Sequence, residues 1–268
     1  MKLAFIGGGT MAEAMIGGIL SKGVARREDI SVGELLEARC RVLQERYGIF
    51  ATTSNSRAVE KSDIVVLSVK PQNLPEVLAQ LKGHLRQEQA ALSIVAGARM
   101  SAISGGLGHP SVIRVMPNTP AQIGEGMSLW TCSSQVCDEV RQSARSILRT
   151  MGEEIYVSDE KYLDMATALS ASGPAYVFLF IESLIDAGVH VGLPRDMART
   201  LALQTVLGSA KLVKETGKHP AELKDMVTSP GGTTVEALLA LEEGGFRATV
   251  ISAVIAAYEK SVELGEER

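Results

Sequence analysis

The stretch KLAFIGGGTMA, residues 2–12, is the part of the sequence that indicates the fold of the N-terminal region most clearly. An apolar run that suits a buried strand leads into three glycines, and a helix-forming stretch follows. Gly7, Gly9 and Ala12 fit the spacing G-x-G-x-x-G/A. In that pattern the first glycine makes a tight turn, the second admits a pyrophosphate, and the third small residue lets the helix pack on the strand. The alternative is a glycine-rich turn without a ligand. The strand–turn–helix context favours a dinucleotide-binding turn.

The chain up to about residue 158 alternates short β-rich runs with helical stretches, as βαβ units around a parallel sheet do. The expected strands cover residues 2–7, 29–34, 50–53, 63–69, 91–97 and 111–118, with further β-rich stretches at 126–133 and 153–159. The expected helices cover residues 10–22, 36–47, 55–60, 73–82, 100–106 and 135–150. The run DIVVLSV is apolar almost throughout, which indicates a strand covered on both faces.

Strand signals stop near residue 159, and the rest of the chain has the pattern of helices. Interruptions are expected near residues 172–174, 192–194, 218–220 and 229–232. The last helix carries one apolar stripe at four-residue spacing, formed by Phe246, Val250, Val254, Tyr258 and Val262. We therefore predict an α/β protein with a Rossmann-like, doubly wound sheet over residues 1–159. An all-α dimerisation domain over residues 160–268 would follow it.

Composition restricts the partners. The net charge of −4 over 268 residues provides no basic field for nucleic acid or an anionic membrane. Three cysteines cannot all pair within one chain, which fits a reducing cytoplasm. The apolar run 175–181 is stopped by Glu182 and Asp186, too soon for a membrane span of about 20 residues. The four histidines lie at no ligand or triad spacing, so no metal site is expected.

Glu34 follows the second expected strand, 22 residues after Ala12. That is close to the offset of about 20 residues at which an acid binds the ribose 2′-hydroxyl of a dinucleotide. A carboxylate there would repel a 2′-phosphate, which favours NADH over NADPH. Arg39 and Arg41 could instead swing toward a phosphate, and Glu37 is an alternative acid. Glu34 could also be a solvated strand end.

Other polar loops end strands at the same edge of the predicted sheet, where open α/β sheets bind ligands. SVKPQN (68–73) would place Lys70 beside a phosphate or the nicotinamide. The next two strands end in VAG (95–97) and VMPNTP (115–120), and the second loop would direct Asn118 toward the cofactor. For each loop taken singly, a proline-bearing turn with ordinary capping is the stronger interpretation, but several of these loops line up on one edge.

The stretch SPGGTT, residues 229–234, places a turn between two helical regions. Gly231 and Gly232 permit a tight backbone, and Thr233 and Thr234 precede a strong helix former. A helix that starts in this way offers free N–H groups and a positive dipole end to a small anion. The alternative is a helix-connecting turn with a threonine N-cap.

These segments together closely resemble the pyrroline-5-carboxylate reductase family. The resemblance runs through FIGGGTMA, SVKPQ, RVMPNTP, ALSASGPAYVF, GLPRDMA, HPAELKDMVTSPGGTT and GGFR, and so covers essentially the whole chain. It implies hydride transfer from NADPH or NADH to the C=N bond of L-1-pyrroline-5-carboxylate, which gives L-proline in the last step of proline biosynthesis. It also implies a cytoplasmic homodimer, and a ring of such dimers as a larger assembly.

The resemblance and the dinucleotide pattern together imply a set of site residues. The expected cofactor-binding residues are Ile6, Gly7, Gly8, Gly9, Thr10, Met11, Glu34, Asn55, Ser68, Val69, Lys70, Pro71, Ala96, Gly97 and Asn118. The expected substrate-binding residues are Ser229, Gly231, Gly232, Thr233, Thr234, Asn118 and, across the dimer, Ser172, Gly173 and Pro174. Thr234 is the expected catalytic residue, close to the imine nitrogen. Glu34 departs from the family, in which many members carry a small, polar or basic residue.

Two other functions remain open on the residues alone. One is a reductase for another small acid, of the hydroxyacid or ketopantoate type, for which Lys211 or Lys214 would be the candidate at the hydride site. The other is a dinucleotide sensor without enzymatic activity. The intact SPGGTT stretch argues against a sensor.

Overall fold

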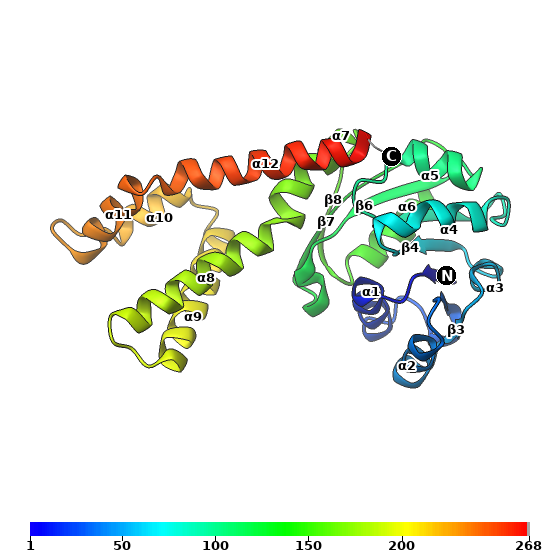
Figure 1. Cartoon of the computed structure of the whole chain (residues 1–268), viewed down its shortest axis with the longest axis horizontal. Coiled ribbons are helices and arrows are strands. Elements are labelled where there is room, and N and C mark those ends of the chain that lie inside the picture. The colour runs from blue at the N-terminus through cyan, green and yellow to red at the C-terminus, as the bar shows by residue number, and fades with distance from the viewer. Residues whose placement is uncertain (267–268) are drawn as a thin grey trace. The chain divides into compact units, whose positions relative to one another are not determined.

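The computed structural model describes residues 1–266 and divides them into two compact units (Figure 1). The first unit comprises residues 1–172 together with the residues from Ala257 onward, and the second comprises residues 173–256. The domain boundary expected at residue 159 remains a prediction, because compact units reflect packing within one chain.

Within residues 1–266, eight strands form one sheet in the order β3-β2-β1-β4-β5-β6-β7-β8. The strands are β1 (Leu3–Ile6), β2 (Ile30–Gly33), β3 (Phe50–Thr52), β4 (Ile64–Leu67), β5 (Ala90–Ser93), β6 (Val112–Met116), β7 (Gly126–Cys132) and β8 (Gly152–Tyr156). Neighbouring strands are parallel except β6 and β7, which are antiparallel.

Helices join the strands and then make up the second unit. In the first unit they are α1 (Thr10–Ser21), η1 (Arg27–Asp29), α2 (Glu37–Tyr47), α3 (Asn55–Val59), η2 (Pro71–Asn73), α4 (Leu74–Leu81), α5 (Met100–Leu107), η3 (Thr119–Ile123), α6 (Asp138–Leu148), α7 (Lys161–Ala166) and the π-helical turn η4 (Thr167–Ala171). The remaining helices are α8 (Gly173–His190), α9 (Arg195–Thr216), α10 (Pro220–Met226), α11 (Thr233–Glu243) and α12 (Phe246–Glu266), of which α12 begins in the second unit and ends in the first.

The core of the first unit lies on both faces of the sheet, because side chains alternate along each strand. In β1, Leu3 and Phe5 pack with residues of α1, α2 and α6, whereas Ala4 and Ile6 pack with residues of α3, α4 and α5. All four residues of β4 are buried, and they alternate between the same two clusters. The double coverage predicted from the apolar run DIVVLSV is confirmed.

The path of the chain produces a crevice at one edge of the sheet. The chain runs from β1 to β2 and β3 on one side, and then returns to β4 on the other side of β1. The carboxyl ends of β1 and β4 therefore form the point where the strand order reverses, which is the ligand-binding position of doubly wound sheets. The predicted Rossmann-like fold with a helical C-terminal part is confirmed.

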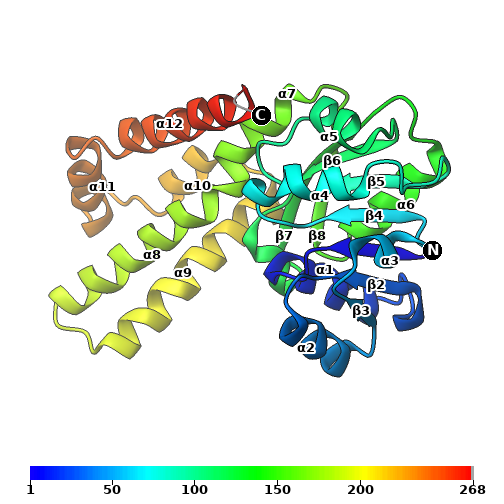
Figure 2. The ribbon, with the colours of Figure 1, turned by 45° about the vertical axis from the view of Figure 1, so that its right-hand side comes forward.

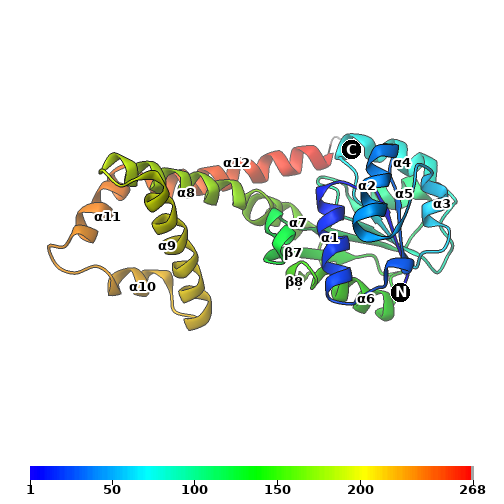
Figure 3. The same cartoon turned by 90° about the horizontal axis from the view of Figure 1, so that it is seen from below.

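In the second unit α8 and α9 lie side by side, and α9 runs back along α8 (Figure 1 and Figure 2). The shorter helices α10 and α11 follow α9 (Figure 3). Residues of α8 that would suit a core are solvent-exposed in the single chain, with Phe178 at 60% and Leu179 at 64% exposed. Such an apolar surface is typical of an oligomer interface.

Two segments differ from the prediction. β5 ends at Ser93 instead of residue 97, because the Ser93 hydroxyl accepts the N–H of Val95 at 3.2 Å and Gly97 takes φ +71°, so that a turn replaces the strand. The interruption expected at 172–174 is only a bend at Ser172, and the residues before it, Thr167–Ala171, form a π-helical turn, so that helical backbone continues from Lys161 to His190. There the N–H of Ser172 donates to Thr167 O, five residues earlier, at 2.9 Å.

This continuity changes the length of one apolar segment. The helical run Lys161–His190 is 30 residues long, and by length and composition it could cross a membrane even though it contains Glu182 and Asp186. The expectation that the helix containing the apolar run 175–181 is too short to span a membrane is therefore wrong. Apolar helices that pack inside proteins or between subunits meet the same criterion, so the run by itself is weak support for a membrane span.

Candidate functional site

The glycine-rich turn between β1 and α1 is held by both neighbouring strands. The N–H of Gly7 donates to Gly33 O, after β2, at 2.8 Å. The hydroxyl of Ser68, after β4, lies 3.1 Å from Ile6 O and 2.8 Å from Gly7 O. Gly7 has φ +96°, and a Cβ on it would lie 2.8 Å from Ser68 O. A side chain at Gly7 would be both strained and obstructed, so the turn requires glycine there.

The N-terminus of α1 is open to an anion. The helix begins at Thr10 after Gly9, and no side chain within residues 1–266 caps it. A Cβ on Gly9 would meet no described atom within 4 Å. Free N–H groups and the helix dipole favour negative charge, and the space beside Gly9 lets a ligand approach the backbone. The turn therefore fits the pyrophosphate of a dinucleotide.

Glu34 lies directly after β2 and binds the glycine-rich turn. Its Oε2 accepts the N–H of Gly8 at 2.8 Å, and its Oε1 accepts the N–H of Leu36 at 3.1 Å. The carboxylate is thus fixed beside the turn at the position of the ribose-binding acid. The alternative in which Glu34 is only a solvated strand end does not match this geometry.

Arg39 on α2 is bound to the turn and to α1. Its Nε donates to Gly8 O at 2.8 Å, and its guanidinium forms an ion pair with Glu13. Arg46 and Tyr47 also bind the Glu13 carboxylate. Burial alone would raise the pKa of Glu13, but the hydrogen bonds from Arg39 and Tyr47 outweigh it and hold that pKa below its ordinary value. The cluster joins α1 to α2 beneath the turn.

A cavity of about 450 Å³ opens at the carboxyl ends of β1, β2 and β4. It brings together the predicted residues Ile6, Gly7, Gly9, Glu34, Asn55, Ser68, Val69 and Lys70. It also contains residues that the sequence analysis missed, namely Gly33, Leu35, Leu36, Gln72, Asn73, Glu76, Val77 and Gln80. The predicted residues Gly8, Thr10, Met11, Pro71, Ala96, Gly97 and Asn118 do not line it.

One contact explains why α4 contributes to this cavity. The amide of Asn55, at the start of α3, donates to Gln80 Oε1 at 2.9 Å, and Gln80 in turn donates to Glu76 at 3.1 Å. The i, i+4 spacing of Glu76 and Gln80 places both on one helix face. That spacing is visible in the sequence, but only the fold shows that this face meets Asn55.

The side chain of Asn118 forms hydrogen bonds within the first unit. Its Oδ1 accepts the N–H of Met127 at 2.8 Å, and its Nδ2 donates to Ser170 O at 3.2 Å. The side chain therefore connects the end of β6 to the start of β7 and to the π-helical turn. The expected contact with the nicotinamide stays a prediction, and the geometry assigns Asn118 a positioning role.

The SPGG turn forms the start of α11 in the second unit. Gly231 has φ +67°, and a Cβ on Gly232 would lie 2.4 Å from Ser229 Oγ. The N-cap residue is Gly232, and no side chain in the described chain caps the helix, so the threonine N-cap of the alternative prediction is wrong. The first turn, with Thr233 and Thr234, keeps N–H groups for a small anion.

The remaining predicted residues occupy two other places. Ser172 ends the first compact unit, and Gly173 and Pro174 begin α8 in the second. Lys211 and Lys214, the candidates for a hydroxyacid-type site, are exposed on α9. In the described residues, no group of three or more His, Cys, Asp or Glu side chains has an arrangement that could hold a metal ion.

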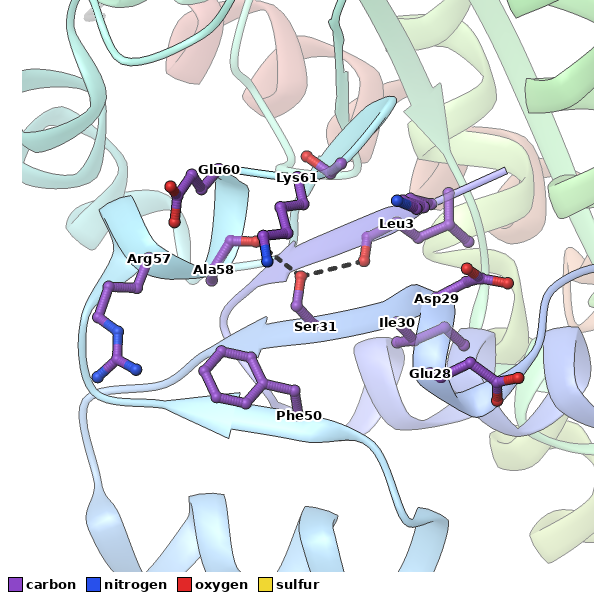
Figure 4. Close-up of a pocket in the computed structure, with 12 residues that line it drawn as sticks. Leu3, Glu28, Asp29, Ile30, Ser31, Phe50, Arg57, Ala58, Glu60 and Lys61 are labelled. Carbon is purple, nitrogen blue, oxygen red and sulfur yellow. Dashed lines mark hydrogen bonds between the residues drawn. The ribbon is translucent and has the colours of Figure 1, made fainter.

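A second cavity, of about 370 Å³, lies at the opposite edge of the sheet, where the strands begin (Figure 4). Its wall includes Ser31, whose hydroxyl lies 2.6 Å from Ala58 O and 3.3 Å from Leu3 O. The acidic residues Glu28, Asp29 and Glu60 and the basic residues Lys2, Arg57 and Lys61 also line it. These charges balance, so the cavity favours neither an anion nor a cation.

Two family models match the chain. The model described as "Pyrroline-5-carboxylate reductase dimerisation" matches residues 160–264, and the one described as "NADP oxidoreductase coenzyme F420-dependent" matches residues 2–97. The first covers the helical part that contains the SPGG turn. The second covers the glycine-rich turn and the cofactor cavity.

Curated relatives are similar over their whole length. A pyrroline-5-carboxylate reductase of Synechocystis is 44% identical over 267 residues, with 100% of this chain and 99% of the relative covered. The Escherichia coli enzyme of the same name is 40% identical over 266 residues, with 99% and 98% covered.

Solved structures agree with the fold. The structure of a pyrroline-5-carboxylate reductase from Coxiella burnetii superimposes with a TM-score of 0.90 at 35% identity, with 98% of each chain covered. The structure of the Plasmodium falciparum enzyme with NADP bound also gives a TM-score of 0.90 at 35% identity, with 99% of this chain and 98% of that one covered.

Proposed function

The chain belongs to the pyrroline-5-carboxylate reductase family, and on that premise we propose that it reduces the C=N bond of L-1-pyrroline-5-carboxylate to give L-proline, the last step of proline biosynthesis. The observation that carries the proposal is the full-length match, because it includes both the glycine-rich turn and the SPGG turn. The similarity supports an imine reductase over a hydroxyacid reductase and over a dinucleotide sensor.

The chain's own residues account for binding of the cofactor. Gly7 and Gly9 admit the pyrophosphate, and the free first turn of α1 binds its charge. Bound NADPH or NADH supplies the hydride that the imine carbon accepts. Glu34, Asn55 and Lys70 add polar groups to the same cavity.

The SPGG turn has the properties that a carboxylate site requires. Ser229 offers a hydroxyl, and Gly232 and Thr233 lie at the uncapped start of α11. We assign the substrate carboxylate to these groups, since they combine hydrogen-bond donors with a positive dipole end. Gly231 supplies the positive φ that the turn needs.

Thr234 is the residue that we assign to the ring nitrogen. A threonine hydroxyl is too weak an acid to be the main proton source near neutral pH. An iminium substrate needs none, because the C=N electron pair becomes the lone pair of the amine nitrogen when hydride adds to carbon. Water then protonates the amine, and Thr234 orients the ring by a hydrogen bond.

The family and the composition support proposals on the assembly and the compartment. Residues 160–264 form a dimerisation domain, so the chain acts as a homodimer. We further propose that dimers assemble into a ring, that neither nucleic acid nor a membrane is a partner, and that the enzyme is cytoplasmic. The net charge of −4 and the three cysteines, each a free thiol within the described residues, support this placement.

The reverse reaction tests the activity in one cuvette. The purified protein is mixed with NAD⁺ or NADP⁺ at high pH, and formation of the reduced nicotinamide is followed by its absorbance. L-Proline should support the reduction, whereas 2-hydroxy acids should not. Reduction with a hydroxy acid and none with proline would reject the imine reductase assignment.

A further inference from the structure

The position and the contacts of Glu34 bear on the choice between the two nicotinamide cofactors. NADH and NADPH differ only at the 2′-position of the adenosine ribose, which carries a hydroxyl in one and a phosphate in the other. The residue after the second strand of a dinucleotide-binding sheet lies at this position. Glu34 follows β2 there, lines the cofactor cavity, and is bound by the N–H groups of Gly8 and Leu36.

These two hydrogen bonds restrict the carboxylate. It cannot leave the ribose position without losing a bond of 2.8 Å to Gly8 and one of 3.1 Å to Leu36. Carboxylate oxygens have several lone pairs, so Glu34 can still accept a hydrogen bond from a ribose hydroxyl. A 2′-phosphate would instead bring like charges together in a partly enclosed site.

The arginines near β2 already have partners. Arg39 is bound to Gly8 O and to Glu13, and Arg46 pairs with the same Glu13 carboxylate. Arg41, an exposed side chain, lies 3.5 Å from Glu37. The cluster around Glu13 therefore holds Arg39, the arginine closest in sequence to Glu34, on the side of α1.

The other charged residues of the cavity also provide no cation beside the 2′-position of the ribose. Its described lining contains two acids, Glu34 and Glu76, and one cation, Lys70. Lys70 follows β4, and β1 lies between β4 and β2. The carboxyl ends of β2 and β4 are thus about 10 Å apart at the usual spacing of neighbouring strands. Lys70 is at the phosphate or nicotinamide side of the cavity, not beside the 2′-position.

We infer that this enzyme prefers NADH to NADPH, and that Glu34 is the residue that determines the preference. The inference rests on the proposed function, since it concerns the cofactor of that reaction. The expected difference in Kd is about 10- to 100-fold in favour of NADH, the scale of one hydrogen bond to a charged group.

Direct titration of the dimeric protein with NADH and with NADPH, followed by nicotinamide fluorescence, tests the inference without catalysis. In Glu34→Gln we expect the Kd for NADPH divided by the Kd for NADH to fall at least about tenfold. The amide does not repel the 2′-phosphate, and it binds the 2′-hydroxyl less strongly than the carboxylate does. Glu37→Gln is the matched control, since Glu37 is exposed on α2 outside the cavity, and it should leave the ratio unchanged. Both constants come from one preparation, so an inactive fraction cancels in the ratio.

The outcomes separate this inference from the proposed function. Tighter binding of NADPH by the wild-type protein, or a ratio unaffected by Glu34→Gln, would overturn the inference even if the protein reduces pyrroline-5-carboxylate with NADPH. Tighter binding of NADH, lost in Glu34→Gln, would support it even if pyrroline-5-carboxylate is not reduced, in which case the proposed substrate alone would be rejected.

Discussion

The backbone N–H of Gly8 donates a hydrogen bond of 2.8 Å to Oε2 of Glu34, which connects the turn after β1 to the residue after β2. The same turn is bound to Gly33 O through Gly7 and to the Ser68 hydroxyl after β4. Three neighbouring strands therefore fix one loop. A preorganised loop of this kind loses little entropy when a ligand binds.

Two glycines of the turn should respond differently to alanine. Gly7→Ala should lower the free energy of unfolding by about 1 to 3 kcal/mol, because φ is +96° and the new Cβ would lie 2.8 Å from Ser68 O. Gly9→Ala should leave stability unchanged, since its Cβ meets no described atom within 4 Å, but should weaken binding of NADH. Urea unfolding and nucleotide titration measure the two effects. Equal stability of Gly7→Ala and the wild-type protein would refute the strain argument.

Because of Glu13, the free energy of unfolding should depend on pH in the acidic range. Its pKa is lower in the folded protein than in the unfolded chain, so its contribution is complete above the unfolded pKa and is lost as pH falls through the folded pKa. Glu13→Gln should reduce stability at pH 7 by about 1 to 3 kcal/mol, the scale of hydrogen bonds to a charged group. The difference from wild type should shrink below about pH 4.5, near the ordinary glutamate pKa.

Urea unfolding at several pH values measures this difference. Glu37→Gln is the control, because its ion pair with Arg41 is exposed and worth at most about 1 kcal/mol. If the difference in the free energy of unfolding between wild type and Glu13→Gln stayed constant from pH 7 to acidic pH, the ionised Glu13 carboxylate would not be the stabilising group.

Asn118 should behave as a positioning residue. Asn118→Ala removes the acceptor of the Met127 N–H and the donor to Ser170 O, and should cost about 1 to 3 kcal/mol of stability. Asn118→Asp keeps the acceptor and loses the donor, so its loss should be smaller. Thermal unfolding ranks the two variants. If both keep the wild-type melting temperature while kcat falls, Asn118 contacts the nicotinamide instead.

Thr234 should assist the reaction without being indispensable. Thr234→Ala should lower kcat about 10- to 100-fold, the scale of one transition-state hydrogen bond. Thr200→Ala is a matched control, because it removes an exposed hydroxyl that bonds to Asp196 O in the same unit. Steady-state kinetics compare the variants, and an unchanged rate for Thr234→Ala would remove Thr234 from the mechanism.

The exposed apolar surface of α8 should be the subunit contact. Phe178→Asp places a charge where the side chain is 60% exposed in the single chain, and should shift the dimer toward monomer. Ile123→Asp, at a side chain 79% exposed in η3 outside the dimerisation domain, should leave the dimer intact. Light scattering after gel filtration gives the masses. A dimeric Phe178→Asp with monomeric Ile123→Asp would place the interface elsewhere.

Local pattern and spacing determined much of the sequence prediction. The apolar runs of β1 and β4 and the glycines at 7 and 9 are visible in the sequence, and the doubly covered sheet and its turn follow from them. SPGG could be predicted as a turn because Pro230 fixes its own φ angle, whereas Gly231 can adopt a positive φ.

The remaining features depend on contacts that are distant in sequence. No local pattern shows that Gln80 reaches Asn55, or that Asn118 binds both Met127 and Ser170. The π-helical turn before Ser172 was missed because glycine and proline there are compatible with the first turn of a new helix as well as with a break. Long-range pairing of this kind becomes visible only in the fold.

Isotopic labelling of the transferred hydride shows whether the protein reduces the C=N bond of pyrroline-5-carboxylate. The protein is supplied with pyrroline-5-carboxylate and a nicotinamide cofactor that carries deuterium at the transferring C4 position, and the product is analysed by mass spectrometry and NMR. We expect L-proline that carries one deuterium on the ring carbon bonded to nitrogen and remote from the carboxylate. Unlabelled proline, deuterium on the carbon that bears the carboxylate, or no proline at all would contradict it.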